Sequence, residues 1–227
     1  MATRLRLALK NQIFILTFKS FVFGLFLYFY NTNPSLIWGG AFITVSFLLY
    51  SRPLFNFTSH SSLFFVLLFL ALWIGGIGSW ITNISWWLLT LSFGVLLGLK
   101  NLILTHRYYW HYFVSFTASY LLFLNFFILD KSNWFWLKWL MTVILIFLLF
   151  KDLLLPEVLS GVTALMIGEL LWITAWLPIG FLSSANLLIL CLLFIVDVFG
   201  YKRLSLKNFG LFIILIIIIL GSSYWRI

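Results

Sequence analysis

The stretch EVLSGVTALMIGELLWITAWL, residues 157–177, decides the fold class of this chain. After its first position it contains a single charged side chain, Glu169, in an otherwise apolar background. An α-helix rises about 1.5 Å per residue, so about 20 such residues cross the ~30 Å hydrocarbon core of a bilayer. The stretch therefore predicts a transmembrane helix.

The rest of the chain has the same character. Of its 227 residues, 64% are hydrophobic and 8% are charged, with a mean hydropathy of +1.15. Soluble domains carry roughly 25% charged residues, so this composition predicts lipid as the solvent. Outer-membrane strands are excluded because the runs are long and do not alternate. We expect an all-α, polytopic transmembrane bundle forming one membrane-embedded domain. The nine predicted spans are 12–30, 34–50, 62–80, 84–99, 108–129, 134–150, 157–177, 181–199 and 209–225.

The positions of the basic residues predict the orientation. If the N-terminus is cytoplasmic and the sides alternate, ten of the fourteen Lys and Arg lie on the cytoplasmic side and two outside. The remaining two, Lys19 and Lys138, lie within spans. This is the bias of the positive-inside rule, and most tryptophans fall near the predicted outer ends, where indole prefers the headgroup region. The sequence predicts nine spans, N-terminus in and C-terminus out, in an inner or plasma membrane.

Basic residues also recur at regular intervals. Arg52, Lys100, Lys151 and Lys202 are 48, 51 and 51 positions apart, and each ends a predicted hairpin on the cytoplasmic side. The spacing indicates hairpin repeats of about 50 residues, as in many transporters. The alternative is that two spans with short loops always occupy about 50 residues.

Several classes of function are disfavoured by the sequence. The net charge of +9 is spread one to three residues at a time between apolar runs, which argues against a nucleic-acid surface. The lone Cys191 permits no intrachain disulfide, and no metal-ligand spacing is present. No nucleophile elbow, Walker lysine loop or dinucleotide glycine pattern occurs. We expect no cofactor, no metal site and no catalytic residue.

Glu169 is the leading candidate for a functional residue. It lies near the middle of its span, where a short acidic side chain cannot reach the headgroups and an unpaired charge is costly. Gly161, Gly168 and Ala175 recur at a spacing of seven and predict a seam for close helix packing. Glu169 lies at the edge of this seam, so we expect it to point into the protein. It then either binds a proton or solute, or is a protonated structural acid.

The span 108–129 supplies a possible partner surface. His111, Ser115, Ser119 and Asn125 fall within about 120° of one helix face, which predicts either a solute pathway or polar packing. At the cytoplasmic end, His106 and Arg107, with Lys100 nearby, are candidates to contact lipid headgroups or an anion.

The other charged residues near spans have simpler interpretations. Lys19 and Lys138 have stems long enough to reach the interface. Asp197 is expected to pair with cytoplasmic basic residues. Glu157 occupies an ordinary helix start, where an acid favours the helix dipole.

Three functional classes follow. The first is a small transporter-like or solute-binding membrane subunit with Glu169 as its central polar group. The second is a non-catalytic structural or accessory subunit of a membrane complex. The third is an intramembrane lipid-modifying enzyme, which the absence of catalytic motifs disfavours. The expected partners are membrane lipids and other membrane subunits.

Overall fold

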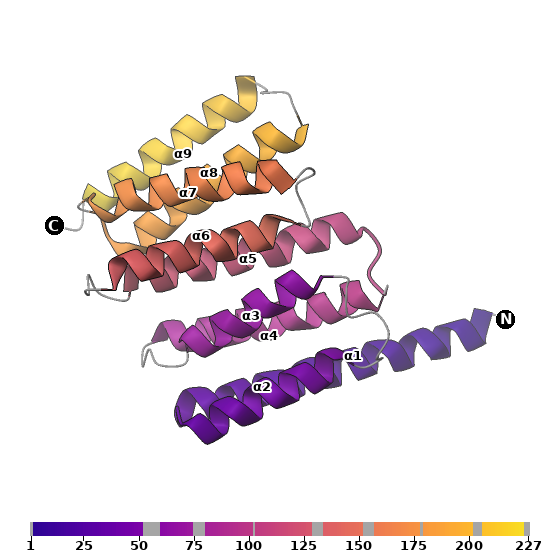
Figure 1. Ribbon diagram of the computed structural model, residues 1–227. Coiled ribbons are helices and arrows are strands. Elements are labelled where there is room, and N and C mark those ends of the chain that lie inside the picture. Colours follow the sequence, from indigo (N-terminus) through magenta and orange to yellow (C-terminus); the bar gives the residue numbers. More distant parts are fainter. Residues whose placement is uncertain are drawn as a thin grey trace. The chain divides into compact units, whose positions relative to one another are not determined.

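A computed structural model describes residues 2–51, 60–74, 80–101, 103–128, 134–151, 157–177, 179–201 and 206–224. These residues form nine α-helices joined by short connections (Figure 1). The fold is therefore all-α, as the sequence predicts. The helices are α1 (Ala2–Thr32), α2 (Leu36–Ser51), α3 (Ser61–Ile74), α4 (Trp80–Lys100), α5 (Arg107–Ile128), α6 (Phe135–Lys151), α7 (Glu157–Ala175), α8 (Phe181–Tyr201) and α9 (Leu206–Tyr224).

Most helix ends lie within three residues of the predicted spans, with two clear differences. The first helix begins at Ala2 rather than at residue 12, because the basic segment before the apolar run is rich in Leu, Ala, Arg and Lys, which favour helix. The third helix is described as far as Ile74, and Trp80, which was predicted to end that span, is the first residue of α4. Gly75, Gly76 and Gly78, residues of a type that loosens a helix, lie outside the described residues.

Four helical segments are long and apolar enough to cross a membrane. Several others are apolar but shorter. The described part of α3 has 14 residues, about 21 Å of helix, which is less than the ~30 Å of a hydrocarbon core. The four segments are Asn11–Thr32, Arg107–Ile128, Glu157–Ala175 and Phe181–Phe199.

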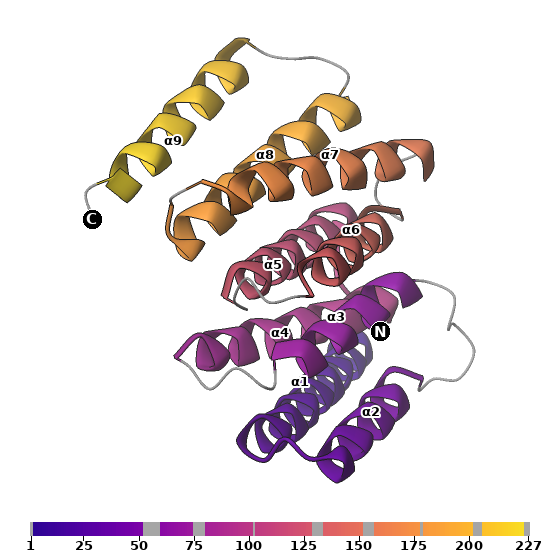
Figure 2. The same cartoon turned by 60° about the vertical axis from the view of Figure 1, so that its left-hand side comes forward.

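The chain divides into two compact units, residues 1–118 and 119–227, and the boundary falls within α5. In the first unit α1 packs against α2 and α4, and α3 packs against α2 and α4. These four helices therefore close into a ring, as the neighbouring ribbons in Figures 1 and 2 show. The ring is a four-helix arrangement with a shared core.

Aromatic side chains fill the core of the first unit. Phe23 of α1 stacks on Phe93 of α4 with ring centroids 4.0 Å apart, and it also contacts Phe42 of α2 at 5.2 Å. Tyr50 of α2 stacks on Phe64 of α3 at 4.1 Å. All five side chains are buried. Each of the four helices thus contributes at least one ring to one continuous cluster, which holds the unit together by dispersion and ring packing.

Small residues bring α1 and α4 close together. A Cβ atom added to Gly24 would lie 2.7 Å from the Thr90 hydroxyl, so only glycine fits there. Ser20 donates a hydrogen bond to the Thr90 carbonyl at 2.8 Å, and Trp86 Nε1 donates to the Gly24 carbonyl at 2.5 Å. Close backbone approach with polar cross-links is typical of helix pairs in membranes.

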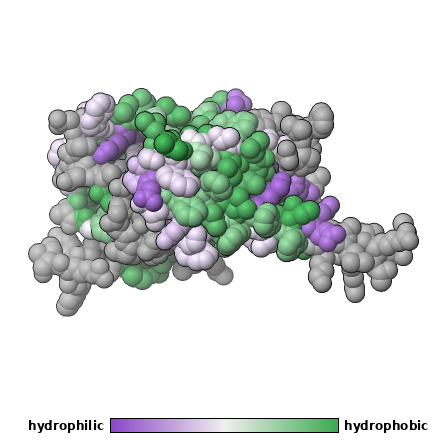
Figure 3. Space-filling view, turned by 90° about the horizontal axis from the view of Figure 1, so that it is seen from below, coloured by the Kyte–Doolittle hydropathy of each residue, from purple (hydrophilic) through white to green (hydrophobic). Residues whose placement is uncertain are grey.

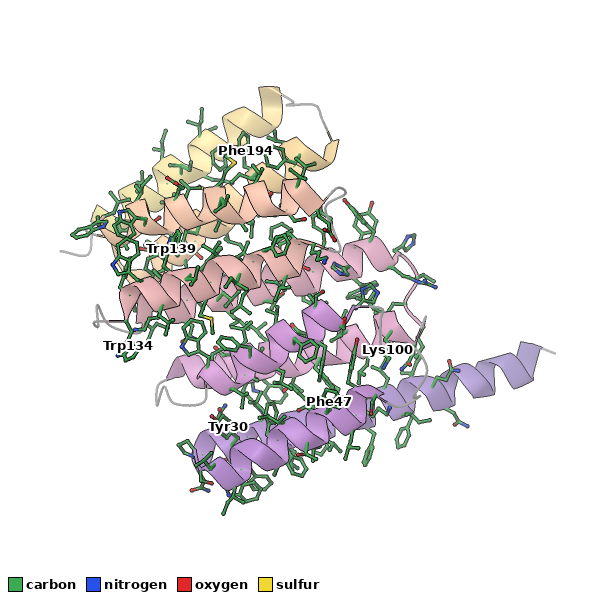
Figure 4. The ribbon with its side chains drawn as sticks, viewed as in Figure 1. Tyr30, Phe47, Lys100, Trp134, Trp139 and Phe194 are labelled. Carbon is green, nitrogen blue, oxygen red and sulfur yellow. The ribbon has the colours of Figure 1, made fainter. Side chains whose placement is uncertain are left out.

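In the second unit α6, α7, α8 and α9 pack in sequence order. Trp139 of α6, labelled in Figure 4, donates a hydrogen bond from Nε1 to the Gly168 carbonyl of α7 at 2.7 Å. Ser160 of α7 donates to the Phe150 carbonyl of α6 at 2.9 Å. The labelled Phe194 of α8 stacks on Phe212 of α9 with centroids 4.4 Å apart.

The surface is rich in exposed hydrophobic side chains. On α9, Ile214, Ile217 and Ile218 are more than half exposed. Hydrophobic side chains also fill the middle of the face seen in Figure 3. Exposed apolar surface of this extent would be an aggregation hazard in water but is the normal surface of a protein in lipid.

Candidate functional site

Glu169 lies on an exposed face of α7. At 100° per residue, five exposed residues of this helix fall within an arc of about 80°, and the exposed Trp176 directly follows the helix. Val158 and Trp176, near the two ends of the helix, are each 73% exposed. We call this surface the α7 outer face. It consists of Val158, Val162, Leu165, Glu169, Ile173 and Trp176.

The prediction that Glu169 points into the protein is therefore wrong, and Gly168 explains why. A Cβ atom added to Gly168 would lie 2.7 Å from Val143 of α6 and 3.2 Å from Trp139, so Gly168 must face α6. Glu169, the next residue, is rotated by about 100° around the helix from Gly168 and therefore lies outside the contact with α6. The buried residues of α7, among them Ala164 and Leu171, occupy the opposite side. The predicted small-residue seam packs closely at Gly168, whereas Gly161 has nothing within 4 Å of an added Cβ.

Glu169 has no ion pair with any residue that the structure describes. It lies twelve residues after the start of α7 and six before its end, about 18 Å and 9 Å along the helix axis. Neither helix terminus is within one turn, so its carboxyl group gains nothing from the helix dipole. In a helix that crosses a membrane, an acid this far from both ends must be neutral, hydrogen-bonded or paired.

The polar residues predicted on the span 108–129 are buried along α5. His111 lies in the first unit with Ser115, whose hydroxyl is 3.4 Å from His111 Nδ1. Ser119 and Asn125 lie in the second unit and are also buried. For Asn125, neither amide atom has a hydrogen-bond partner among the described residues. Burying polar atoms of this kind costs folding free energy unless a water or a ligand forms hydrogen bonds with them.

The ring of His60 lies 5.1 Å from the ring of His111. His60 immediately precedes α3 and has a φ of 65°, and His106, which immediately precedes α5, has a φ of 57°. Left-handed backbone is uncommon for residues other than glycine and costs of order 1 kcal/mol or more. No sequence pattern predicts the contact between the two rings, because 51 residues separate them.

Two lysines converge on the C-terminal end of α2. Lys100, the last residue of α4, is 5% exposed and donates a hydrogen bond to the Tyr50 carbonyl. Its ammonium group also lies 4.0 Å from the centre of the Tyr50 ring. Lys19 of α1 donates to the Leu49 carbonyl at 3.2 Å. The last carbonyls of a helix lack intrahelical donors and carry the negative end of its dipole. Each lysine therefore donates a hydrogen bond to one of these carbonyls of α2 and places a positive charge beside the negative end of the dipole.

This environment changes the chemistry of Lys100, which follows the predicted span 84–99. Burial, together with the positive charge of Lys19, lowers the pKa of the Lys100 ammonium group below its ordinary value of 10.5. Lys100 therefore does not share the exposed position of His106 and Arg107, with which it was expected to contact headgroups.

Other charged residues have varied surroundings. Lys151, the last residue of α6, forms an ion pair with Glu157 at 3.1 Å, and their side chains are 42% and 70% exposed. Asp197 is half-buried one turn before the end of α8. Its expected basic neighbours, and Arg52 and Lys202 of the predicted repeats, lie outside the described residues.

Two grooves lie in the first unit, of about 390 Å³ between α1 and α4 and about 360 Å³ between α1 and α2. Lys19 lines the second, but none of the five residues expected to bind a solute lines either groove. Over the described ranges, no three His, Cys, Asp or Glu residues come close enough together to hold a metal ion.

No protein-family model matches the chain, and no match was found among curated proteins or among solved structures.

Proposed function

We propose that the chain is an accessory subunit of a membrane complex, which binds another membrane protein within the bilayer and has no catalytic site of its own. The alternation of loop charge supports nine spans, with the N-terminus in the cytoplasm, in an inner or plasma membrane. The helix bounds also support them, since each predicted span has one corresponding helix. The shorter helices then cross with help from flanking residues or local thinning of the bilayer.

The observation that carries the proposal is the position of Glu169 on the α7 outer face. Apolar neighbours such as Leu165 and Ile173 need no protein partner, because lipid covers them equally well. A carboxyl group at this depth is different, since lipid tails offer it no donor and no cation. A partner helix supplies both, and Glu169 lines neither of the two grooves described above.

Blue-native electrophoresis of the full chain, extracted from its native membrane in a mild detergent, tests the proposal. The wild-type chain is expected to migrate in a complex and Glu169→Leu as the released chain. Glu157→Gln changes an acid on the same helix but at its cytoplasmic end, and is expected to leave the complex intact. A wild-type chain that migrates alone, or a complex indifferent to Glu169→Leu, would exclude this role.

A solute-binding or transport role is the second candidate, and the buried polar residues of α5 favour it. Asn125 in particular has a donor and an acceptor that no described residue satisfies. Solute and proton flux into liposomes containing wild type, Asn125→Leu or Glu169→Gln separates the two candidates. Transport predicts flux that at least one substitution abolishes, whereas an accessory subunit predicts no flux above that of protein-free liposomes.

The topology is tested by cysteine labelling in a Cys191→Ser background. A cysteine at position 33 is expected to react with an impermeant maleimide added outside. A cysteine at position 101 is expected to react only after permeabilisation. The reverse result would overturn the orientation and the span count together.

A further inference from the structure

We propose that the α7 outer face binds a transmembrane helix of another protein that carries a lysine or arginine at the depth of Glu169. The inference rests on the accessory role proposed above and specifies the chemistry of the partner.

The geometry of the face suits a single helix. Its residues follow one another at spacings of four, three, four, four and three, the pattern that aligns with a straight neighbouring helix. The apolar members lie on both sides of Glu169 along the axis, with Val158, Val162 and Leu165 toward the cytoplasmic end and Ile173 and Trp176 toward the other. A helix lying on this face would exclude lipid from Glu169 while leaving the contacts of α7 with α6 and α8 undisturbed.

Among the residues that the structure describes, no lysine or arginine forms an ion pair with Glu169. Lys138 of α6 is near in sequence to Trp139, which bonds to Gly168. It is, however, rotated by about 100° from Trp139 and about 140° from Val143, the two residues that face α7 at Gly168. Lys19 and Lys100 lie in the other unit and donate to the end of α2.

Charge complementarity favours a helix of another protein over a second copy of this chain. Two copies meeting through their α7 outer faces would bring one Glu169 against the other, and the two carboxyl groups could not both be ionised, because like charges repel in a medium of low dielectric constant. A lysine or arginine opposite Glu169 gives an ion pair with hydrogen bonds, which is the usual way a membrane interior accommodates an acid.

The test uses the full chain in liposomes, with a donor fluorophore at its N-terminus, and synthetic transmembrane peptides with an acceptor. The peptides are leucine helices of about 21 residues that carry arginine, leucine or glutamate at one central position. We expect the arginine peptide to associate with the wild-type chain roughly 5- to 30-fold more tightly than the leucine peptide. This preference should disappear in Glu169→Leu and persist in Glu157→Gln, and the glutamate peptide should bind no better than leucine.

Equal association of the arginine and leucine peptides with the wild-type chain would overturn the inference. So would energy transfer between two labelled copies of the chain that is lost in Glu169→Leu, because the face would then bind a second copy. If the native complex still depends on Glu169 while the peptides show no preference, the accessory role stands and only the partner chemistry is rejected. If the peptides show the preference but the native complex ignores Glu169, the accessory role fails and the binding chemistry stands.

Discussion

Replacing Lys100 by methionine tests the main electrostatic feature of the first unit. Lys100, labelled in Figure 4, joins α4 to the end of α2. It does so through its bond to the Tyr50 carbonyl and its position over the Tyr50 ring. Methionine keeps a long apolar side chain, so the packing of the stem is largely preserved. The substitution therefore removes the ammonium group and little else.

The expected loss can be worked from these contacts. A buried carbonyl left without its donor costs about 1–3 kcal/mol, and the lost cation–π contact adds about 0.5–1 kcal/mol. Removing a buried charge beside Lys19 acts in the opposite direction. That gain is limited to about 1 kcal/mol because the C-terminal dipole of α2 already favours a cation there. We expect Lys100→Met to lower the free energy of unfolding by about 1–3 kcal/mol.

Unfolding in mixed dodecyl maltoside and SDS micelles, followed by tryptophan fluorescence, measures this change. Lys151→Met is the matched control, because Lys151 also ends a helix but its ion pair with Glu157 is exposed and worth about 0.5 kcal/mol or less. Equal effects of the two substitutions, or a more stable Lys100→Met variant, would refute the assignment of Lys100 as the cap of α2.

The lowered pKa of Lys100 gives the same variant a pH signature. Between that lowered pKa and 10.5 the unfolded chain holds a proton on Lys100 that the folded chain has released. The contribution of Lys100 to the free energy of unfolding therefore rises with pH across that window. Below the window it is constant, because Lys100 is protonated in both the folded and the unfolded chain. The stability difference between wild type and Lys100→Met should grow with pH within the window. A difference independent of pH would contradict the burial of the ammonium group.

Three further substitutions have defined expectations, each measured by the same unfolding assay. Gly24→Val should destabilise by about 1–3 kcal/mol, because the added side chain collides with Thr90 at the contact between α1 and α4. Trp139→Phe should cost about 1 kcal/mol by removing the hydrogen bond to the Gly168 carbonyl. Asn125→Leu should be neutral or stabilise by up to about 1 kcal/mol, because it removes two buried polar atoms that no described residue satisfies.

Each of these substitutions has a control or a contrary outcome. Gly40→Val places the same side chain where nothing lies within 4 Å, so a similar loss there would show that the Gly24 effect is not a collision. Trp136 is 63% exposed, and Trp136→Phe should cost less than Trp139→Phe. A loss above about 2 kcal/mol in Asn125→Leu would show that Asn125 is bonded to a water or ligand in the folded protein.

The helices could be predicted closely from the sequence because they coincide with apolar runs of about the length that crosses a bilayer. The run 157–177, for example, predicts a helix over those residues, and the observed α7 begins at Glu157 and ends at Ala175. The extension of α1 to Ala2 was missed because basic residues end an apolar run without ending a helix. The start of α4 was misplaced because Trp80 continues the apolar character of the preceding run, so hydropathy does not show that a new helix begins there.

The arrangement of the side chains was less predictable. Gly168 could be identified as a packing residue, but the side on which α6 lies cannot be read from a helix that is apolar all round. The direction of Glu169 was therefore predicted wrongly. The contact of His60 with His111, and the meeting of Lys19 and Lys100 at one helix end, depend on which helices are neighbours. Loop charge predicts the side of the membrane but not those neighbours.

The charged groups of this chain differ in where their compensation comes from. Lys100 is buried, yet a helix C-terminus and an aromatic ring accommodate it. Glu157 is exposed, yet it has both a helix N-terminus and Lys151. Glu169 has neither a helix end within one turn nor an ion pair among the described residues, although it lies near the middle of a helix long and apolar enough to cross a membrane, where compensation is most valuable. Because the other two are compensated within the chain, the missing group opposite Glu169 is best sought outside it, which is why the partner helix is the first thing to test.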